Sequence, residues 1–165
     1  MGRKDFFMID RKYMAHYVDA SFGALTTNYV RLGKDLEEFN IELNPDTETS
    51  KNILGESTFK HKGYEESASA DPFYAEKGDA LFEKLQEIVD TRAKDDTCKT
   101  SALEVHLWED PDNDGAYPAI KQDVYLIPTS YGGDTTGYQI PFTCYYTGER
   151  IPGKFDPDTK TFTAN

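Results

Sequence analysis

Alternation of apolar and polar side chains is longest in the segment Tyr138-Gln139-Ile140-Pro141-Phe142-Thr143-Cys144-Tyr145-Tyr146. A period of two puts the even-numbered residues of this segment on one face of a β-strand, and that face has the apolar character of a core. Pro141 interrupts the strand, because proline has no N–H to donate to a neighbouring strand. We therefore predict a long strand with a bulge or an edge at Pro141.

Shorter segments on both sides have the same character, and one segment differs. Strands are predicted at 13–20, 39–43, 57–64, 103–108, 119–128 and 159–163. The exception has apolar residues at i, i+1, i+4, i+7 and i+8, which is one stripe of an amphipathic helix of about 79–92. This stripe consists of Leu81, Phe82, Leu85, Ile88 and Val89. The pattern predicts an α+β, β-rich domain, a β-sandwich or barrel-like fold with one flanking helix.

The length of 165 residues corresponds to one domain, 1–165. A chain of this size buries about 70% of its surface on folding, which suffices for a core without disulfides or metals. Residues 1–12 are a candidate N-terminal arm. Residues 44–55 are mostly polar and lie between two predicted strands, so they are predicted to form a long inter-strand loop.

Loops of this length in a compact domain are usually functional or disordered, and this one ends in an apolar pair that could dock on a neighbouring molecule. We take it as a candidate self-assembly loop. Its candidate contact residues are Asn44, Pro45, Thr47, Ile53 and Leu54.

The charge balance limits the partners of the chain. Eighteen Lys and Arg against 30 Asp and Glu give a net charge of −12 at pH 7. Such a chain repels phosphate, which disfavours specific DNA binding and attachment to anionic membranes. The apolar run Phe6–Ile9 is too short for a signal-peptide core or a membrane span. We expect a soluble protein made in the cytoplasm.

Few residues have the spacing that catalysis or metal binding requires. Asp110, Asp112 and Asp114, followed by Gly115, begin like a calcium loop, but the twelfth position is Lys121. An acidic turn between two strands explains the same residues. The histidines are isolated from one another in sequence, and the two cysteines, Cys98 and Cys144, are expected to remain thiols. We expect neither enzymatic activity nor a cofactor.

The order of these parts resembles that of the major tail tube proteins of tailed bacteriophages, particularly those of Gram-positive hosts. The resemblance spans roughly residues 35–163 and is based on element order and scattered short motifs. These motifs are Asn44-Pro45, Ile53-Leu54-Gly55-Glu56, Gly63-Tyr64-Glu65, Asp71-Pro72-Phe73-Tyr74, Gly78-Asp79, Thr136–Phe142, Gly153-Lys154-Phe155-Asp156 and Thr161-Phe162-Thr163.

The resemblance implies a structural virion protein. Its subunits would form stacked hexameric rings, sharing an inner barrel that surrounds the tape-measure protein and later conducts DNA without binding it specifically. It also implies contacts with tail-terminator and distal tail proteins. The alternating residues Glu38, Asn40 and Glu42 form an acidic face that is our candidate for the lumen.

Two alternatives remain open at this point. One is a carbohydrate- or calcium-binding β-sandwich module, which the 11 tyrosines and the Asp110–Gly115 segment favour. The other is the tube of a contractile tail or of a tail-like bacteriocin, which the same fold would also serve.

Overall fold

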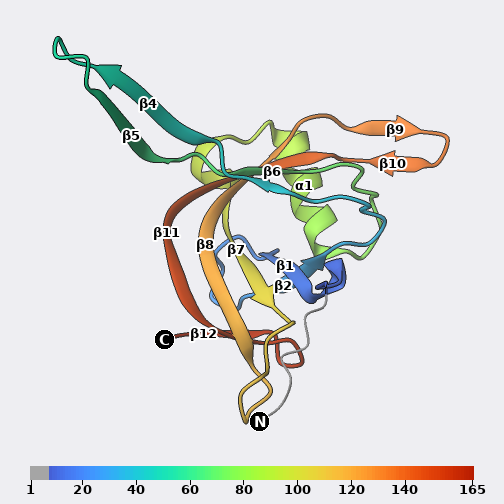
Figure 1. Ribbon diagram of the computed structural model, residues 1–165. Helices are drawn as coiled ribbons and strands as arrows, with labels where there is room; N and C mark the ends of the chain where they lie inside the picture. The colour runs from blue at the N-terminus through green and yellow to red at the C-terminus, as the bar shows by residue number, and fades with distance from the viewer. Residues whose placement is uncertain (1–7) are drawn as a thin grey trace.

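The computed structural model describes residues 8–165 and shows a strongly curled sheet with a single α-helix beside it (Figure 1). Residues 1–7 of the predicted N-terminal arm lie outside the described residues. The elements are η1 (Arg11–Tyr13), β1 (Met14–Asp19), β2 (Tyr29–Leu32), β3 (Ile41–Glu42), β4 (Pro45–Lys51), β5 (Ser57–Tyr64), β6 (Ser67–Ala70), α1 (Ala80–Thr91), η2 (Asp95–Cys98), β7 (Lys99–His106), β8 (Tyr117–Pro128), β9 (Gly132–Asp134), β10 (Gly137–Gln139), β11 (Phe142–Asp156) and β12 (Thr161–Ala164). The predicted α+β, β-rich class is confirmed.

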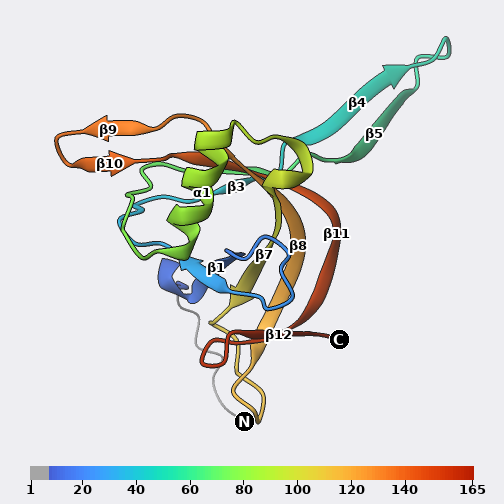
Figure 2. The same ribbon diagram turned by 180° about the vertical axis from the view of Figure 1, so that it is seen from behind.

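The main sheet is antiparallel and has the strand order β2-β1-β7-β8-β11-β6-β3, with β12 paired to the far end of β11. The long strands β8 and β11 carry its curvature, which gives the sheet a half-barrel shape (Figures 1 and 2). The register of β11 against β8 shifts between Thr147 and Ile151. Gly148 lies in this irregularity with φ of 72°, a left-handed conformation that glycine adopts without strain.

The sheet carries two hydrophobic cores, one on each of its faces. Ala102 belongs to the core beneath α1, and its neighbours Leu103 and Val105 belong to the second core. Phe155 of β11 closes the second core against β1 and β2, because its ring lies 4.6 Å from that of Tyr17 and 5.7 Å from that of Tyr29. The helix therefore covers one face of the sheet, and the curl of the sheet itself covers part of the other.

Helix α1 has the boundaries and the buried stripe that the sequence predicts, to within one residue at each end. Asp79 caps it by accepting a hydrogen bond from the backbone N–H of Leu81 at 3.1 Å. Leu81 and Leu85 are fully buried, and Arg92 ends the helix in a left-handed conformation. The helix is thus held by its apolar stripe against the sheet.

One predicted element is wrong. The segment 44–55 is not a long loop, because Pro45–Lys51 forms strand β4, which pairs with β5. Only residues 52–56 connect the two strands. Both faces of β4 are exposed, so its polar sequence has none of the apolar alternation by which a strand is usually recognised.

Other predictions hold with changed boundaries. The predicted strand 39–43 shortens to Ile41–Glu42, and the segment 138–146 divides at Pro141 into β10 and β11. Strands are present in the other five predicted segments, and Cys98 and Cys144 are buried free thiols.

Truncating Leu85 tests the burial of the helix. We expect Leu85→Ala to lower the free energy of unfolding by about 2–5 kcal/mol, because it opens a cavity in the core beneath α1. Urea denaturation measures the loss, with Glu87→Ala on the exposed face of the helix as the control. A loss for Leu85→Ala no larger than that of the control would show that the helix is not packed as described.

Candidate functional site

Strands β4 and β5 form a two-stranded ribbon, here called the arm (residues 45–64), that projects away from the body (Figures 1 and 2). Every residue of β4 is exposed, and so is every residue of β5 except Gly63. Bonds at its base tie it to the body: the Asn44 side chain donates to the carbonyl of Glu65 at 3.0 Å, and the Glu65 N–H donates to the Leu43 carbonyl. A two-stranded ribbon is at best marginally stable alone in water. The arm therefore has the properties of a segment that needs a partner.

The two faces of the arm differ in chemistry. Register and alternation put Thr49 and Phe59 on one face, and Phe59 is 67% exposed there. His61 is on the same face, and its ring meets that of Tyr64 edge-on at 4.6 Å. The opposite face carries charges, including the ion pair of Lys62 with Glu48 at 2.9 Å. The arm thus presents one aromatic face and one charged face.

The arm is electrically neutral in a strongly acidic chain. Three acidic residues (Asp46, Glu48, Glu56) balance three lysines (Lys51, Lys60, Lys62), so the net charge of −12 resides entirely in the rest of the sequence. Contact between the arm and another copy would therefore avoid most of the like-charge repulsion that opposes contact between two bodies.

The tip of the arm holds the predicted apolar pair in a defined turn. The Asn52 side-chain oxygen accepts the backbone N–H groups of Leu54 and Glu56, at 2.9 and 3.0 Å. This turn leaves Ile53 fully exposed and Leu54 76% exposed. Of the predicted assembly residues, Ile53 and Leu54 lie at the tip and Asn44 and Pro45 at the base. Thr47 lies on the aromatic face.

A second hairpin, β9 with β10, leaves the same end of the body on the side opposite to the arm (Figures 1 and 2). Its turn is held by the Asp134 carboxylate, which accepts the backbone N–H of Thr136 at 2.8 Å. Two unlike projections on opposite sides of one subunit suit a head-to-tail contact, in which different surfaces of two copies meet.

The face of the sheet opposite to α1 is uncovered at this same end. Tyr125 and Tyr145 pair across β8 and β11, and Ser69 lies 3.4 Å from Thr143, hydroxyl to hydroxyl. Glu42 joins this face through its pairing with Ser67. The surface is therefore rich in hydroxyl groups.

The three residues of the predicted acidic face do not share one strand. Glu42 belongs to β3, whereas Glu38 and Asn40 precede it. The Asn40 amide donates to the Glu38 carboxylate at 2.6 Å, so these two side chains are paired with each other.

The Asp110–Gly115 segment is the acidic turn between β7 and β8. One oxygen of Asp112 accepts the backbone N–H groups of Asp114 and Ala116, both at 2.9 Å, and the other lies 3.3 Å from the Lys154 ammonium. The backbone hydrogen bond from Ala116, with those from Asp114 and Lys154, lowers the pKa of Asp112. Among residues 8–165 no three His, Cys, Asp or Glu side chains are grouped to hold a metal. One oxygen of Asp112 is engaged by the turn and the other lies near Lys154, and the calcium hypothesis stays a prediction.

The histidines lie on three different strands, and one of them is buried. Arg11 places Nη2 2.9 Å from His16 Nε2, and because arginine can only donate, this nitrogen accepts. Burial, together with the charges of Arg11 and Arg31 and against that of Glu104, lowers the pKa of His16 to about 4. His16 is therefore neutral near pH 7 and lines a basic cavity of about 600 Å³ between η1 and β2.

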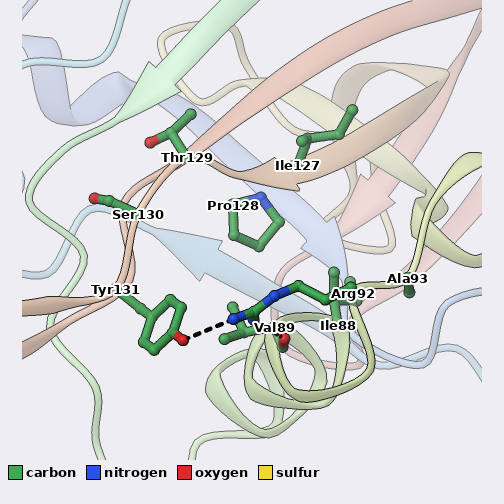
Figure 3. A pocket seen from close by; sticks show the side chains of 9 residues that line it. All are labelled: Ile88, Val89, Arg92, Ala93, Ile127, Pro128, Thr129, Ser130 and Tyr131. Carbon is green, nitrogen blue, oxygen red and sulfur yellow. Dashed lines mark hydrogen bonds between the residues drawn. The ribbon is translucent and has the colours of Figure 1, made fainter.

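A second cavity, of about 410 Å³, lies where the C-terminal end of α1 meets the end of β8 (Figure 3). Its walls are formed by Ile88, Val89 and Ala93 and by the residues 127–131. The Arg92 guanidinium donates to the Tyr131 hydroxyl at 2.9 Å and so bridges the helix and the segment that follows β8.

Among the described residues 8–165, no helix is both long enough and apolar enough to cross a membrane.

The lowered pKa of His16 predicts a loss of stability in mild acid. His16 binds a proton near pH 6.5 in the unfolded chain and only near pH 4 in the folded chain. The contribution of neutral His16 to the free energy of unfolding is therefore fully present above pH 6.5 and falls as the pH drops toward 4. We expect a loss of about 1.6 kcal/mol between pH 6.5 and 5, because the slope approaches its full value of about 1.36 kcal/mol per pH unit only well below pH 6.5.

His16→Gln provides the control, because glutamine can accept the hydrogen bond from Arg11 but does not titrate. Urea denaturation at both pH values should show a smaller loss for the variant than for the wild type. Equal losses in the two proteins would mean that His16 is not the titrating group.

Comparison with known proteins finds similarity at the level of fold. No protein-family model matches the chain, and no curated protein sequence matches it. Among solved structures, the chain is similar to the sheath/tube terminator of an extracellular contractile injection system (PVC) in its extended state. The TM-score is 0.52 and the identity 10%, over 89% of this chain and 97% of that chain.

The chain is also similar to a chain from the tail of an empty GTA particle, determined with C6 symmetry. Here the TM-score is 0.54 and the identity 12%, over 95% of this chain and 100% of that chain. The fold of this chain is therefore one that components of tail-like particles also have.

Proposed function

We propose that the chain is a non-enzymatic structural subunit of a phage-tail-like particle, and that its copies form stacked hexameric rings that make a tail tube. The observation that carries this proposal is the neutral, fully exposed arm, which lacks a partner surface within the described part of its own chain. Similarity to two tail components over most of their length supports the same function.

The energetics of the arm favour assembly. Ordering the backbone costs about 1–2 kcal/mol per residue, and this cost is normally offset by burying apolar surface. The arm buries almost none in the single chain, since Phe59, Tyr64, Ile53 and Leu54 are all exposed. Burial of these side chains against another copy would supply the missing free energy.

The two projections define how copies would meet. A head-to-tail contact closes into a ring when the rotation between subunits divides a full turn. The C6 symmetry of the GTA tail structure supports six subunits. In such a ring the arm of one copy would extend over the neighbour on one side, and β9–β10 over the neighbour on the other.

The hydroxyl-rich uncovered face of the sheet is our candidate for the lumen wall, with Glu42 on it. Serine, threonine and tyrosine side chains give DNA no strong attachment, and the net charge of −12 repels it. Lys99, which the register places beside Tyr125, lies 3.9 Å from the Asp123 carboxylate. The tube would surround a tape-measure protein, end at tail-terminator and distal tail proteins, and serve as the DNA conduit of a virion. A structure of the assembled particle with Glu42 facing outward would contradict this placement.

A second candidate function is a cap at the end of such a tube. The similarity to a sheath/tube terminator favours it, and also keeps a contractile particle among the candidates. A cap would form single rings, whereas a tube subunit would form stacks.

Negative-stain electron microscopy of the purified chain tests the proposal. We expect tubes of stacked rings at high protein concentration, since ring and stacking contacts both gain from mass action. Single rings alone would favour the cap, and a monomer at every concentration would contradict both functions.

Removing the arm separates assembly from folding. Pro45 and Tyr64 are directly paired, so a short Gly-Ser turn can replace residues 46–63 without straining the body. We expect a melting temperature within about 2 °C of the wild type and no assembly, because the arm contributes little to either core. Tubes formed by the armless chain would disprove the role of the arm.

A single substitution tests the aromatic face of the arm. Phe59→Ala should weaken assembly more than Thr58→Ala, which is its matched control on the opposite face.

A further inference from the structure

The cavity at the C-terminal end of α1 is apolar inside and charged at its rim. Ile88, Val89 and Pro128 contribute apolar walls, and Arg92 and Tyr131 lie at one side of it (Figure 3). Arg92 stacks over the Tyr131 ring at 5.3 Å in addition to the hydrogen bond between them. Within residues 8–165, no carboxylate lies within ion-pair distance of Arg92. The Arg92 guanidinium also donates to the Val89 carbonyl at the end of the helix. The cavity thus combines an apolar interior with a cation that pairs with no carboxylate of residues 8–165.

The tip of the arm has the complementary composition. Ile53 and Leu54 are among the most exposed aliphatic side chains of the described chain, and the turn around Asn52 holds them together. Glu56 lies two residues further on. Its carboxylate accepts from the Asn52 amide at 3.1 Å, and no cation of residues 8–165 pairs with it. The tip thus combines an apolar pair with the anion Glu56. The cavity combines apolar walls with the cation Arg92, so the two surfaces are complementary.

The arm does not reach the cavity of its own chain. Seven residues of β4 extend about 23 Å at about 3.3 Å per residue, and the ribbon points away from the body in both views (Figures 1 and 2). The body end from which the arm leaves is also the end at which β8 finishes and the cavity lies. The arm leaves this end obliquely (Figures 1 and 2), so in an assembly it can reach the corresponding end of an adjacent copy.

We propose that the cavity formed by the end of α1 and the end of β8 receives Ile53 and Leu54 of the arm of a second copy, with Glu56 of that arm pairing with Arg92. This inference rests on the proposed function, because it names the receiving surface for the assembly arm. The contact is heterologous, because it joins two different surfaces of the same chain. In a closed ring each copy inserts its tip into one neighbour and receives the tip of the other, so every arm has a partner.

Cross-linking between two single-cysteine variants tests the contact. Leu54→Cys, carrying a size tag, is mixed with untagged Ser130→Cys, whose residue lines the cavity and is exposed. The native thiols of Cys98 and Cys144 are buried and should not compete. After mild oxidation we expect a tagged–untagged dimer on a non-reducing gel.

Thr159→Cys is the matched control, because this exposed residue lies in the turn between β11 and β12, at the other end of the body (Figure 1). Its yield with Leu54→Cys should be less than about one fifth of the Ser130→Cys yield, which corresponds to about 1 kcal/mol of preference. Equal yields from the two sites would overturn the proposed contact.

Charge exchange provides a second test. Arg92→Glu should lower the Leu54→Cys cross-link to Ser130→Cys about fivefold, and Glu56→Arg in the tagged partner should restore it, because the pair is re-formed with reversed signs. Failure of Glu56→Arg to restore the yield lost in Arg92→Glu would contradict the Glu56–Arg92 pairing.

Electron microscopy of the same mixtures separates this inference from the proposed function. Rings or tubes without the cross-link overturn the docking site and leave the assembly function standing. A cross-link without rings or tubes supports the docking site and counts against the tube. The absence of both contradicts both.

Discussion

Strand β7 is buried on both of its faces along Thr100–Val105, and the arrangement of the other elements follows from this constraint. A strand in that position needs an apolar cover on each side. Helix α1 covers one side, and on the other the sheet curls until Phe155 of β11 meets Tyr17 of β1. Glu104 is the one charged residue of this part of β7. Its carboxylate pairs at 2.8 Å with Arg150, which lies in the irregular part of β11. The long curved strands β8 and β11 are the means by which one sheet encloses two cores.

Because most apolar residues pack against the two faces of the main sheet, some parts of the molecule remain outside both cores. Helix α1 is the one α-helix among residues 8–165, and it cannot cover the whole sheet. The arm, the β9–β10 hairpin and the hydroxyl-rich face all remain outside the two cores. Their chemistry is not uniform, since the arm is neutral and partly aromatic whereas the rest of the chain is acidic. This difference in charge and in exposed aromatic surface is the reason that we propose the arm as the contact segment.

The sequence predicts most precisely those elements that bury one face and expose the other. The stripe from Leu81 to Val89 identifies α1, and the alternation around Phe142 identifies the start of β11, because each has one apolar and one polar face. Strand β4 escapes the same reasoning, since neither of its faces is buried and its pairing with the predicted strand β5 depends on backbone hydrogen bonds that composition does not reveal. The candidate assembly residues Ile53 and Leu54 could still be named, because they form an apolar pair in a polar segment. The cavity could not be predicted, as its walls come from residues 88–93 and 127–131, which only the packing of α1 against β8 brings together.

We propose that the arm gains its stability from another copy. Hydrogen exchange measured by mass spectrometry, on the monomer and on the assembled particle, tests it directly. In the monomer, amide protons of 47–51 and 57–61 should exchange at least about 100-fold faster than those of β7, because opening the arm exposes little apolar surface. In the particle they should become protected while β7 changes little. Slow exchange of the arm in the monomer, or equally fast exchange in both states, would contradict the claim.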